Sequence, residues 1–389
     1  MAPPPRHRRL IGFAVLLLVV VGGGVAIGFA LTRPRGTSPA RGARSQVPAT
    51  PSTPTTERPA APPLTITSIT PAAGATGVGG MTPISVTFSS AIASSSTLPA
   101  LAPSTAGSWA VHGETLTFTP TEAFVPLSKV TVSVPAGIAA ADGTMLARAE
   151  AATFEVVGGS PLRLQQLLSQ LDYSPLSWAP SGSAISPSDA VPQRAALFDP
   201  PTGTFSWRQT GWPRQLLSMW KEGRFNVMTR GLVMSFQADH GLDVSGEPTA
   251  GLWNDLLSVL AAGDFNTGGY NFALASQAKP ESLKIWHNGA MVLRVPMNSG
   301  IAASPTPDGT FPVFARYRSQ VMRGTNPDGV TYADPVQYVA YFHSGDAVHY
   351  LARANYGIPQ SLGCVELSLA DAARAWPWLA YGTPVAIIN

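Results

Sequence analysis

The chain has 389 residues, enough for two or three domains, and its apolar content of 45% is that of a globular protein. Its 37 glycines and 37 prolines predict many turns and little continuous helix. The net charge is only +3 and the sequence contains no basic stripe with interleaved aromatic residues, so nucleic acid is not an expected partner.

The amino-terminal residues predict a location outside the cytoplasm for most of the chain. Arg6, Arg8 and Arg9 precede an apolar run from Leu10 to Leu31. As a helix this run would be roughly 33 Å long, which is enough to cross a bilayer. Its length favours an uncleaved transmembrane anchor within residues 1–32 over a cleaved signal peptide, and the arginines favour a cytoplasmic amino end. In both interpretations the remainder is extracytoplasmic, either anchored to the membrane or secreted after cleavage.

Two segments of different composition follow. Residues 33–63 are rich in Pro, Thr and Ser with almost no apolar side chains, so they predict a flexible tether. Between residues 64 and 158, short runs such as ISVTFSS and TLTFTP alternate apolar and polar residues between turn clusters. Several short strands at this spacing predict a β-sandwich, and the segment resembles bacterial immunoglobulin-like (Ig-like) domains. It contains no catalytic cluster, so we interpret it as a spacer or docking module.

Residues 159–263 are predicted to form a small helical module. Its first helix carries an apolar stripe of leucines in LRLQQLLSQL. The later string FQADHGLDVSGEPTAGLWNDLL belongs to two more helices, with Thr229 and Thr249 as expected caps and Gly241 at the end of the first. This string resembles the peptidoglycan-binding three-helix module. Residues 172–224 exceed that family's compact form, and the sequence leaves open whether they are a loop, an extra subdomain or part of the module.

The residues from 282 onward are predicted to be rich in β-strands. Asn288-Gly289 is the favoured two-residue turn between two alternating strands. A second hairpin is expected to turn at Ser344-Gly345-Asp346, a short helix is expected to start after a Ser368 cap, and residues 382–388 form a closing strand. The expected fold is therefore multidomain and mainly β, with an amino-terminal transmembrane helix, an Ig-like sandwich, a helical module and a β-rich carboxyl-terminal domain.

Cys364 is the only cysteine of the chain. An exported protein with one cysteine cannot form an internal disulfide, so this thiol is a small buried side chain, an intermolecular link or a nucleophile. A nucleophilic thiol needs a base, and histidine is the natural one. His343 and His349 flank the turn of the hairpin that precedes Cys364, so both are candidates. The amides of Gly363 and Cys364 are candidate oxyanion donors.

Residues 282–389 resemble the L,D-transpeptidase catalytic domain, also called the YkuD domain. The matching strings, in the family's order, are KIWHNGAMVLRVPMNSG, TPDGTF, AVH and SLGCVELSLADA, which runs into GTPVAII. The family motif is a His, a loop and then Ser/Thr-His-Gly-Cys. Carried onto this chain, the motif implies Cys364 as the nucleophile and His349 as the general base. It also implies that Ser361 and Gly363 shape the loop before the nucleophile.

The sequence departs from the family pattern close to the expected site. Leu362 replaces the motif His, Tyr350 stands where Gly usually follows the catalytic His, and Glu366 stands where Asn or Arg is frequent. His343 is the competing base, although its neighbours place it outside the family's His position. These departures leave open a changed substrate preference or an inactive relative.

The resemblance implies transpeptidation of peptidoglycan stem peptides in the cell wall. The Cys364 thiolate would attack the carbonyl of a diamino acid at the third stem position and release the terminal D-alanine. The side-chain amine of a second stem would then resolve the thioester and leave a cross-link between third residues. Tyr341, Tyr350 and Arg353 are candidate substrate-binding residues. No cofactor is implied, and no Cys/His cluster has metal-binding spacing.

Two other functions stay open at this point. A non-catalytic peptidoglycan-binding or scaffold protein with a degenerate transpeptidase domain is favoured by Leu362. An L,D-carboxypeptidase would use water in place of the second stem. The Cys364→Ala variant separates a binder from an enzyme, and product analysis separates a transferase from a hydrolase.

Overall fold

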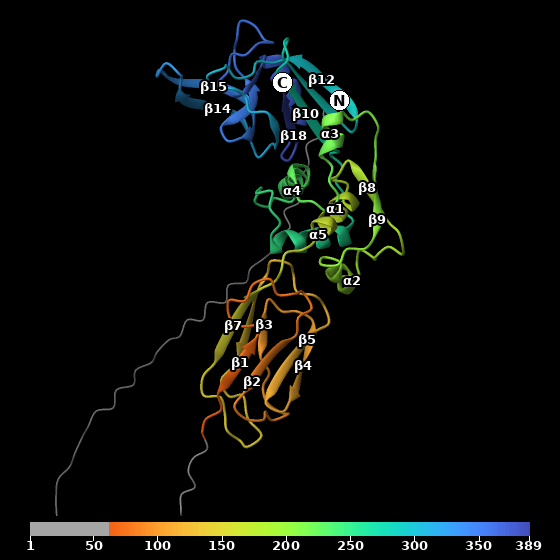
Figure 1. Cartoon of the computed structure of the whole chain (residues 1–389), viewed down its shortest axis with the longest axis vertical. Coiled ribbons are helices and arrows are strands. Elements are labelled where there is room, and N and C mark those ends of the chain that lie inside the picture. Colours follow the sequence, from red (N-terminus) through yellow and green to blue (C-terminus); the bar gives the residue numbers. More distant parts are fainter. Residues whose placement is uncertain (1–61) are drawn as a thin grey trace, which may run out of the picture. The chain divides into compact units, whose positions relative to one another are not determined.

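The computed structural model describes residues 62–389 of the chain (Figure 1). The predicted transmembrane segment at 1–32 and nearly all of the predicted tether lie outside the described residues. Among residues 62–389, no helix is both long and apolar enough to cross a membrane.

The first described domain is a sandwich of two antiparallel sheets. Their strand orders are β1-β2-β5-β4 and β3-β6-β7. The strands are β1 (Ile66–Thr70), β2 (Ile84–Phe88), β3 (Ala100–Ala102), β4 (Gly107–His112), β5 (Thr115–Pro120), β6 (Lys129–Val134) and β7 (Glu150–Glu155). Inner-face residues of both sheets, such as Val86 and Val132, meet in one apolar core. This confirms the predicted sandwich, whereas β3 and the largely exposed β4 were not predicted as strands.

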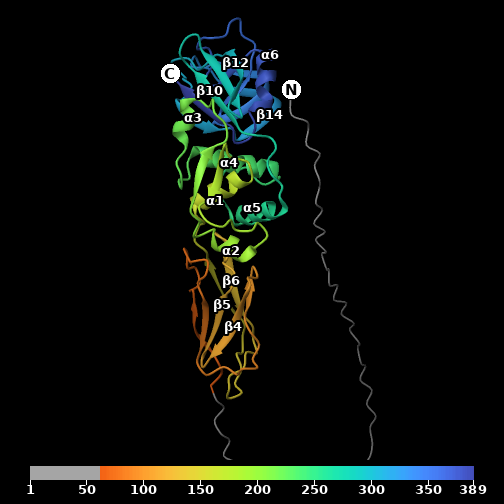
Figure 2. The ribbon, with the colours of Figure 1, turned by 90° about the vertical axis from the view of Figure 1, so that its right-hand side faces the viewer.

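Helices and one small hairpin follow, and Figure 2 shows α1, α4 and α5 close to one another. The elements are α1 (Pro161–Gln170), β8 (Leu176–Pro180), α2 (Ala190–Ala195), β9 (Gly203–Trp207), α3 (Arg214–Met219), α4 (Val227–Asp239) and α5 (Ala250–Ala262). Residues 172–224 are therefore the β8–β9 hairpin with two short helices. The predicted cap at Thr229 was wrong, because the side chain of Asn226 accepts the Thr229 N–H at 3.1 Å. Thr249 caps α5 as predicted.

These helices share an apolar core with the carboxyl-terminal strands. Leu167 and Trp253 belong to the same buried cluster as Phe272 of β10 (Asn271–Ser276). The backbones of Gly231 and Gly382 approach so closely that a Cβ at either position would overlap the carbonyl oxygen of the other. The helical segment is therefore built into the β domain by packing. Its resemblance to a peptidoglycan-binding module stays a prediction.

The carboxyl-terminal domain contains two sheets, ordered β12-β11-β10-β18-β13 and β14-β15-β16-β17. Besides β10, its elements are β11 (Ser282–His287), β12 (Ala290–Pro296), β13 (Gly309–Pro312), β14 (Ala315–Thr325), β15 (Thr331–His343), β16 (Asp346–Tyr350), β17 (Val365–Leu367), α6 (Leu369–Ala375), a 3-10 turn (Trp376–Trp378) and β18 (Pro384–Ile388). The turns predicted at Asn288-Gly289 and Ser344-Gly345 are confirmed. The predicted start at residue 282 is too late, because β10 lies in the centre of the first sheet.

Two features of the second sheet position the candidate site. Strands β16 and β17 are parallel neighbours, with His349 opposite Glu366 in their register. The long β14–β15 hairpin extends from the same sheet, and no sequence signal had indicated its length. The chain therefore brings the candidate base and the residues after the candidate nucleophile together on adjacent strands.

Candidate active site

Cys364 ends the loop that leads into β17, and hydrogen bonds fix its backbone. The Ser361 hydroxyl donates to the Cys364 carbonyl oxygen at 2.6 Å and accepts the Gly363 N–H at 3.1 Å. Gly363 has a φ of +122°, and a Cβ there would overlap the Asp346 carboxylate. A side chain is therefore excluded directly before Cys364, for reasons of both backbone conformation and space.

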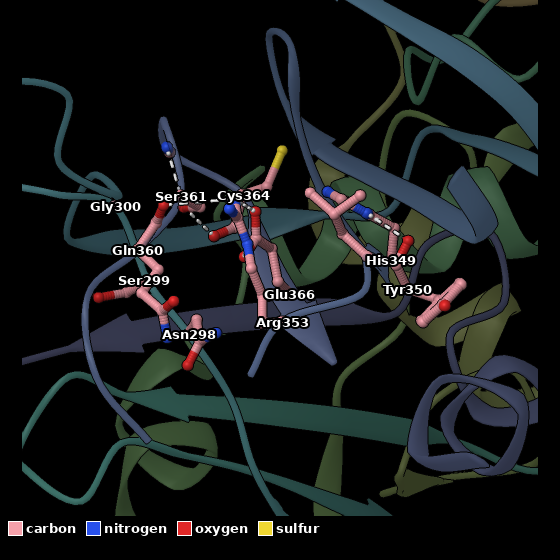
Figure 3. Close-up of polar contacts among 12 residues, drawn as sticks. Asn298, Ser299, Gly300, His349, Tyr350, Arg353, Gln360, Ser361, Cys364 and Glu366 are labelled. Carbon is pink, nitrogen blue, oxygen red and sulfur yellow. Dashed lines mark hydrogen bonds and ion pairs between the residues drawn. The ribbon is translucent and has the colours of Figure 1, made fainter. Parts of the chain in front are cut away.

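A neighbouring segment holds this loop from the other side (Figure 3). Asn298 exchanges both backbone hydrogen bonds with Glu366, at 3.0 and 2.9 Å. The Ser299 carbonyl oxygen accepts the Ser361 N–H at 2.9 Å. Because the segment bonds the chain before and after Cys364, the thiol is carried by backbone that is fixed on both sides.

The ring of His349 on β16 is oriented by a backbone carbonyl group. Its ring is buried, with 2% exposure, and its Nδ1 lies 3.0 Å from the Tyr350 carbonyl oxygen. This carbonyl accepts only, so Nδ1 carries the proton and Nε2 carries the lone pair. Figure 3 shows the second ring nitrogen on the side of the ring toward Cys364.

Cys364 and His349 line one pocket of about 690 Å³. The pocket is walled by the nucleophile loop, β16 and the β14–β15 hairpin. Its polar lining includes Gln320, Asp334, Tyr341, Asp346, Arg353 and Glu366, and its apolar lining includes Ile301, Val321, Met322, Leu351 and Leu362. Within residues 62–389, no group of three or more His, Cys, Asp or Glu side chains could hold a metal ion.

The pocket includes some of the predicted substrate-binding residues and leaves out others. Tyr341 and Arg353 line it. The Tyr350 side chain instead packs against the core between the two sheets, and only its carbonyl group serves the site. The competing base, His343, is not in the pocket lining, and its Nδ1 lies 3.2 Å from an Asp346 carboxylate oxygen. The geometry therefore favours His349 as the partner of Cys364.

Burial disfavours the charged forms of both His349 and Cys364. Burial lowers the pKa of His349 below its ordinary value, with smaller opposing effects of nearby groups. Burial raises the pKa of the Cys364 thiol to about 12, and the carboxylates of Asp346 and Glu366 act in the same direction. A hydrogen bond from the Ala347 backbone opposes them. A thiol with a raised pKa would need a base to take its proton before it could act as a nucleophile.

An ion pair between a buried Glu366 and a partly exposed Arg353 lies beside these groups. Glu366 is 2% exposed and accepts two hydrogen bonds from Arg353, from Nε at 2.8 Å and from Nη2 at 2.7 Å. Nη2 also donates to the Gln360 carbonyl oxygen at 3.3 Å. Arg353 was predicted to bind a substrate carboxylate, but its own chain already supplies one. Sequence reasoning missed this pair because the loop that brings the two residues together has no local signature.

The predicted oxyanion role of the Gly363 amide needs correction. Its N–H points to the Ser361 hydroxyl and is therefore occupied. Among the described residues, the Cys364 N–H makes no hydrogen bond. The Cys364 amide is thus the donor at this position that could bind an oxyanion.

Two parts of the chain match sequence models of known domain families. Residues 60–156 match the bacterial Ig-like domain, and residues 272–387 match the L,D-transpeptidase catalytic domain. A search of curated proteins gave no match to the chain.

Solved structures of L,D-transpeptidases also align with the chain. One from Mycobacterium smegmatis has 15% identity and a TM-score of 0.28, and the alignment covers 84% of this chain and 99% of that one. L,D-transpeptidase 3 from Mycobacterium tuberculosis, with a faropenem-derived adduct, has 14% identity and a TM-score of 0.29, with 83% and 98% covered. The catalytic domain of the E. faecium enzyme has 24% identity and a TM-score of 0.28, with 30% and 95% covered.

At TM-scores this low the structural alignments add nothing to the assignment, which rests on the two sequence models. The residues that match the L,D-transpeptidase sequence model, 272–387, include Cys364, His349 and the whole pocket lining. The chain therefore contains a bacterial Ig-like domain and, at its carboxyl-terminal end, an L,D-transpeptidase catalytic domain.

Proposed function

We propose that this protein is a cell-wall L,D-transpeptidase that acts through a Cys364 thioester, with His349 as the general base. The observation that carries the proposal is the shared pocket. The thiol and an imidazole with a free Nε2 line it together, on a loop and a strand whose backbones are hydrogen-bonded in place.

The first half-reaction transfers the donor stem to the enzyme. His349 Nε2 takes the thiol proton while Sγ attacks the carbonyl carbon of the third-position diamino acid. The Cys364 N–H donates to the developing oxyanion, and the imidazolium returns the proton to the departing D-alanine nitrogen as the C–N bond breaks. The product of this step is a thioester on Cys364.

The second half-reaction transfers the acyl group to another stem. The side-chain amine of its third residue attacks the thioester, the C–S bond breaks, and the sulfur regains a proton through His349. The result is a cross-link between two third residues. In a carboxypeptidase, water would replace the amine and leave an uncross-linked tripeptide stem.

The proposed location is the outer face of the cytoplasmic membrane. The apolar run from Leu10 to Leu31 would anchor the chain, and residues 33–63 would tether the folded domains at the wall. Tethering an enzyme beside an insoluble polymer raises the local concentration of its substrate. Cleavage after the apolar run would release a secreted form with the same site.

One feature favours a second candidate, a non-catalytic protein that binds stems. Leu362, directly before Gly363, lines the pocket where the family motif has a histidine. Its carbonyl oxygen accepts the Ser304 hydroxyl at 2.9 Å, so the backbone of the loop is held without a polar side chain at this position. Leu362 thus removes a polar group but leaves the loop's hydrogen bonds in place.

The test is product analysis with purified full-length protein and tetrapeptide-stem muropeptides. A transpeptidase gives cross-linked dimers with loss of D-alanine. Accumulation of tripeptide monomers without dimers would indicate a carboxypeptidase. Unchanged substrate with measurable binding would indicate the non-catalytic protein.

A further inference from the structure

The side chains of Cys364, His349 and Glu366 meet at one pocket beside the second sheet. Glu366 is the central residue of β17, and Cys364 directly precedes this strand. His349 lies directly opposite Glu366 on the parallel neighbour β16. All three line the pocket, which places a buried carboxylate beside the base as well as the nucleophile.

A carboxylate in this place is a hazard for a catalytic imidazole. His349 Nδ1 is already bound to the Tyr350 carbonyl oxygen, so Nε2 is the nitrogen that a neighbouring acid could capture. A buried carboxylate without a partner is costly, and the pairing of imidazolium with carboxylate would relieve that cost. The base would then be protonated, with its reactive nitrogen turned away from the thiol.

Arg353 is the hydrogen-bond partner of the Glu366 carboxylate. Its guanidinium binds both carboxylate oxygens with two parallel hydrogen bonds, at 2.8 and 2.7 Å, a geometry that fixes the plane of the acid. A third contact, to the Gln360 carbonyl oxygen at 3.3 Å, ties the guanidinium to the nucleophile loop. Glu366 in turn is held by its two backbone hydrogen bonds to Asn298.

We propose that Arg353 is a positioning residue that holds the Glu366 carboxylate away from His349, and so keeps Nε2 of the base free for the Cys364 proton. The inference rests on the proposed function, because it assigns Arg353 a role through the catalytic base. Glu366 departs from the family pattern, and in this proposal Arg353 compensates for the acidic side chain within the same pocket.

The electrostatic environment of His349 agrees with this role. The titratable and charged groups that face it are Glu366 and Cys364 from the β17 side, Arg353 from the loop after β16, and Asp334 from β15. Burial is the main reason for its lowered pKa; Glu366 and Asp334 raise the pKa and Arg353 lowers it. Removal of Arg353 alone therefore removes the charge that offsets the effect of Glu366 and Asp334 on the pKa of His349.

The experiment is an NMR titration of the His349 ring, which needs no activity and so is independent of the proposed reaction. The proteins are wild type, Arg353→Gln, Glu366→Gln and the double variant, with the His349 signal assigned through His349→Gln. We expect Arg353→Gln to raise the titration midpoint by about one pH unit, a tenfold change in proton affinity. The double variant should return to the wild-type midpoint, and Glu366→Gln should lie at or below it.

Activity and stability are measured on the same proteins. At pH values below the wild-type midpoint, the acylation rate of Arg353→Gln should fall to about a tenth of the wild-type rate, and the double variant should recover to within about threefold of wild type. Arg353→Lys, which keeps the charge, should retain the wild-type midpoint and serves as the test if Arg353→Gln does not fold. Arg374→Gln, which removes an arginine from the exposed pair with Asp371, is the matched control.

Two results would overturn the inference. One is a double variant that stays as slow as Arg353→Gln, because a purely structural ion pair gives no recovery when both partners are removed. The other is a His349 midpoint in Arg353→Gln that stays at the wild-type value or, where that variant does not fold, a midpoint in Arg353→Lys that departs from the wild-type value. Failure of the wild type to form any acyl-enzyme would instead contradict the proposed function, and the titration would still decide the role of Arg353.

Discussion

The Ig-like domain and the catalytic domain are both built from two packed sheets, but they differ in the polar side chains that they bury. Between residues 62 and 157, Ser128 is the only polar side chain that is fully buried. The catalytic domain buries a set of polar side chains around its pocket, which includes Glu281, Asn298, Ser299, His349, Ser361 and Glu366. Buried polar groups destabilise a fold unless they are hydrogen-bonded.

The difference indicates that polar side chains are buried around the candidate site, although burial of polar groups lowers stability unless they are hydrogen-bonded. In the Ig-like domain the core between the two sheets is apolar, so its side chains can be exchanged for others of similar volume. Around Cys364 each of these buried polar side chains has a hydrogen-bond partner, and Asn298 and Ser361 bond the loop backbone directly, so single changes there should alter both rate and stability. The predictions below test this contrast.

The largest effect is expected for the nucleophile itself. Cys364→Ala removes the atom that forms the thioester, and loss of a nucleophile lowers the rate by about 10⁴-fold or more. Acylation and cross-linking should both be undetectable, while thermal unfolding should change little. Dimer formation by Cys364→Ala at an appreciable fraction of the wild-type rate would contradict the assignment.

The two histidines give a matched pair for the next largest effect. His349→Gln removes the base inside the pocket and should lower the acylation rate by about 10²–10⁴-fold. His343→Gln changes a ring that lies outside the pocket lining, so its rate should stay within about twofold of wild type. Rate constants from time-resolved intact mass measure both, and the opposite order would make His343 the base.

The pH dependence follows from the two pKa shifts. Since burial lowers the pKa of His349, the base is neutral at pH 7, and the rate should fall only below about pH 6.5, by up to about tenfold per unit. Since burial raises the pKa of Cys364 to about 12, no second rise from thiol ionisation should occur between pH 7 and 10. A rate that climbs through pH 8–9 would show that the thiolate forms before attack.

The glycines near the site offer a smaller effect with its own control. Gly363→Ala places a Cβ against Asp346 at a φ of +122°, and such strain should cost about 1–3 kcal/mol of unfolding free energy and slow acylation. Gly345→Ala lies in the nearby turn with no atom within 4 Å of the added Cβ, so its cost should stay within about 0.5 kcal/mol. Equal losses in denaturant unfolding of the two variants would contradict the loop geometry.

The smallest effect on catalysis is expected in the Ig-like domain. Ile84 is fully buried in its core, so Ile84→Val should cost about 0.5–1.5 kcal/mol of stability. The acylation rate at 25 °C should be unchanged, because no hydrogen bond of the site depends on this side chain. A large loss of the acylation rate in Ile84→Val would mean that the core of the Ig-like domain also influences the catalytic site.

The sequence predicted those parts of the fold that have local signals. The Asn288-Gly289 turn, the Thr249 cap and the alternating strands of the sandwich each depend on a few adjacent residues. The resemblance to the catalytic family implied Cys364 and His349, which the structure places in one pocket. Spacing alone had left His343 as a second base.

The remaining features depend on contacts between distant segments. The Arg353–Glu366 pair forms only because the loop after β16 folds back over β17, and no spacing rule describes that loop. The Gly363 N–H donates to the Ser361 hydroxyl, a contact that no local sequence pattern indicates. Tyr350 alternates with His349 along β16, so it faces the core, and strand alternation could have indicated this once His349 was assigned to the pocket.

The central claim is tested most directly by intact-mass spectrometry of the full-length protein in detergent, incubated with a tetrapeptide-stem muropeptide or with a carbapenem. The account predicts one covalent adduct on the wild type, its absence on Cys364→Ala, its slow formation on His349→Gln and its normal formation on His343→Gln. Folded wild-type protein that forms no adduct with either reagent would contradict the account and favour the stem-binding protein.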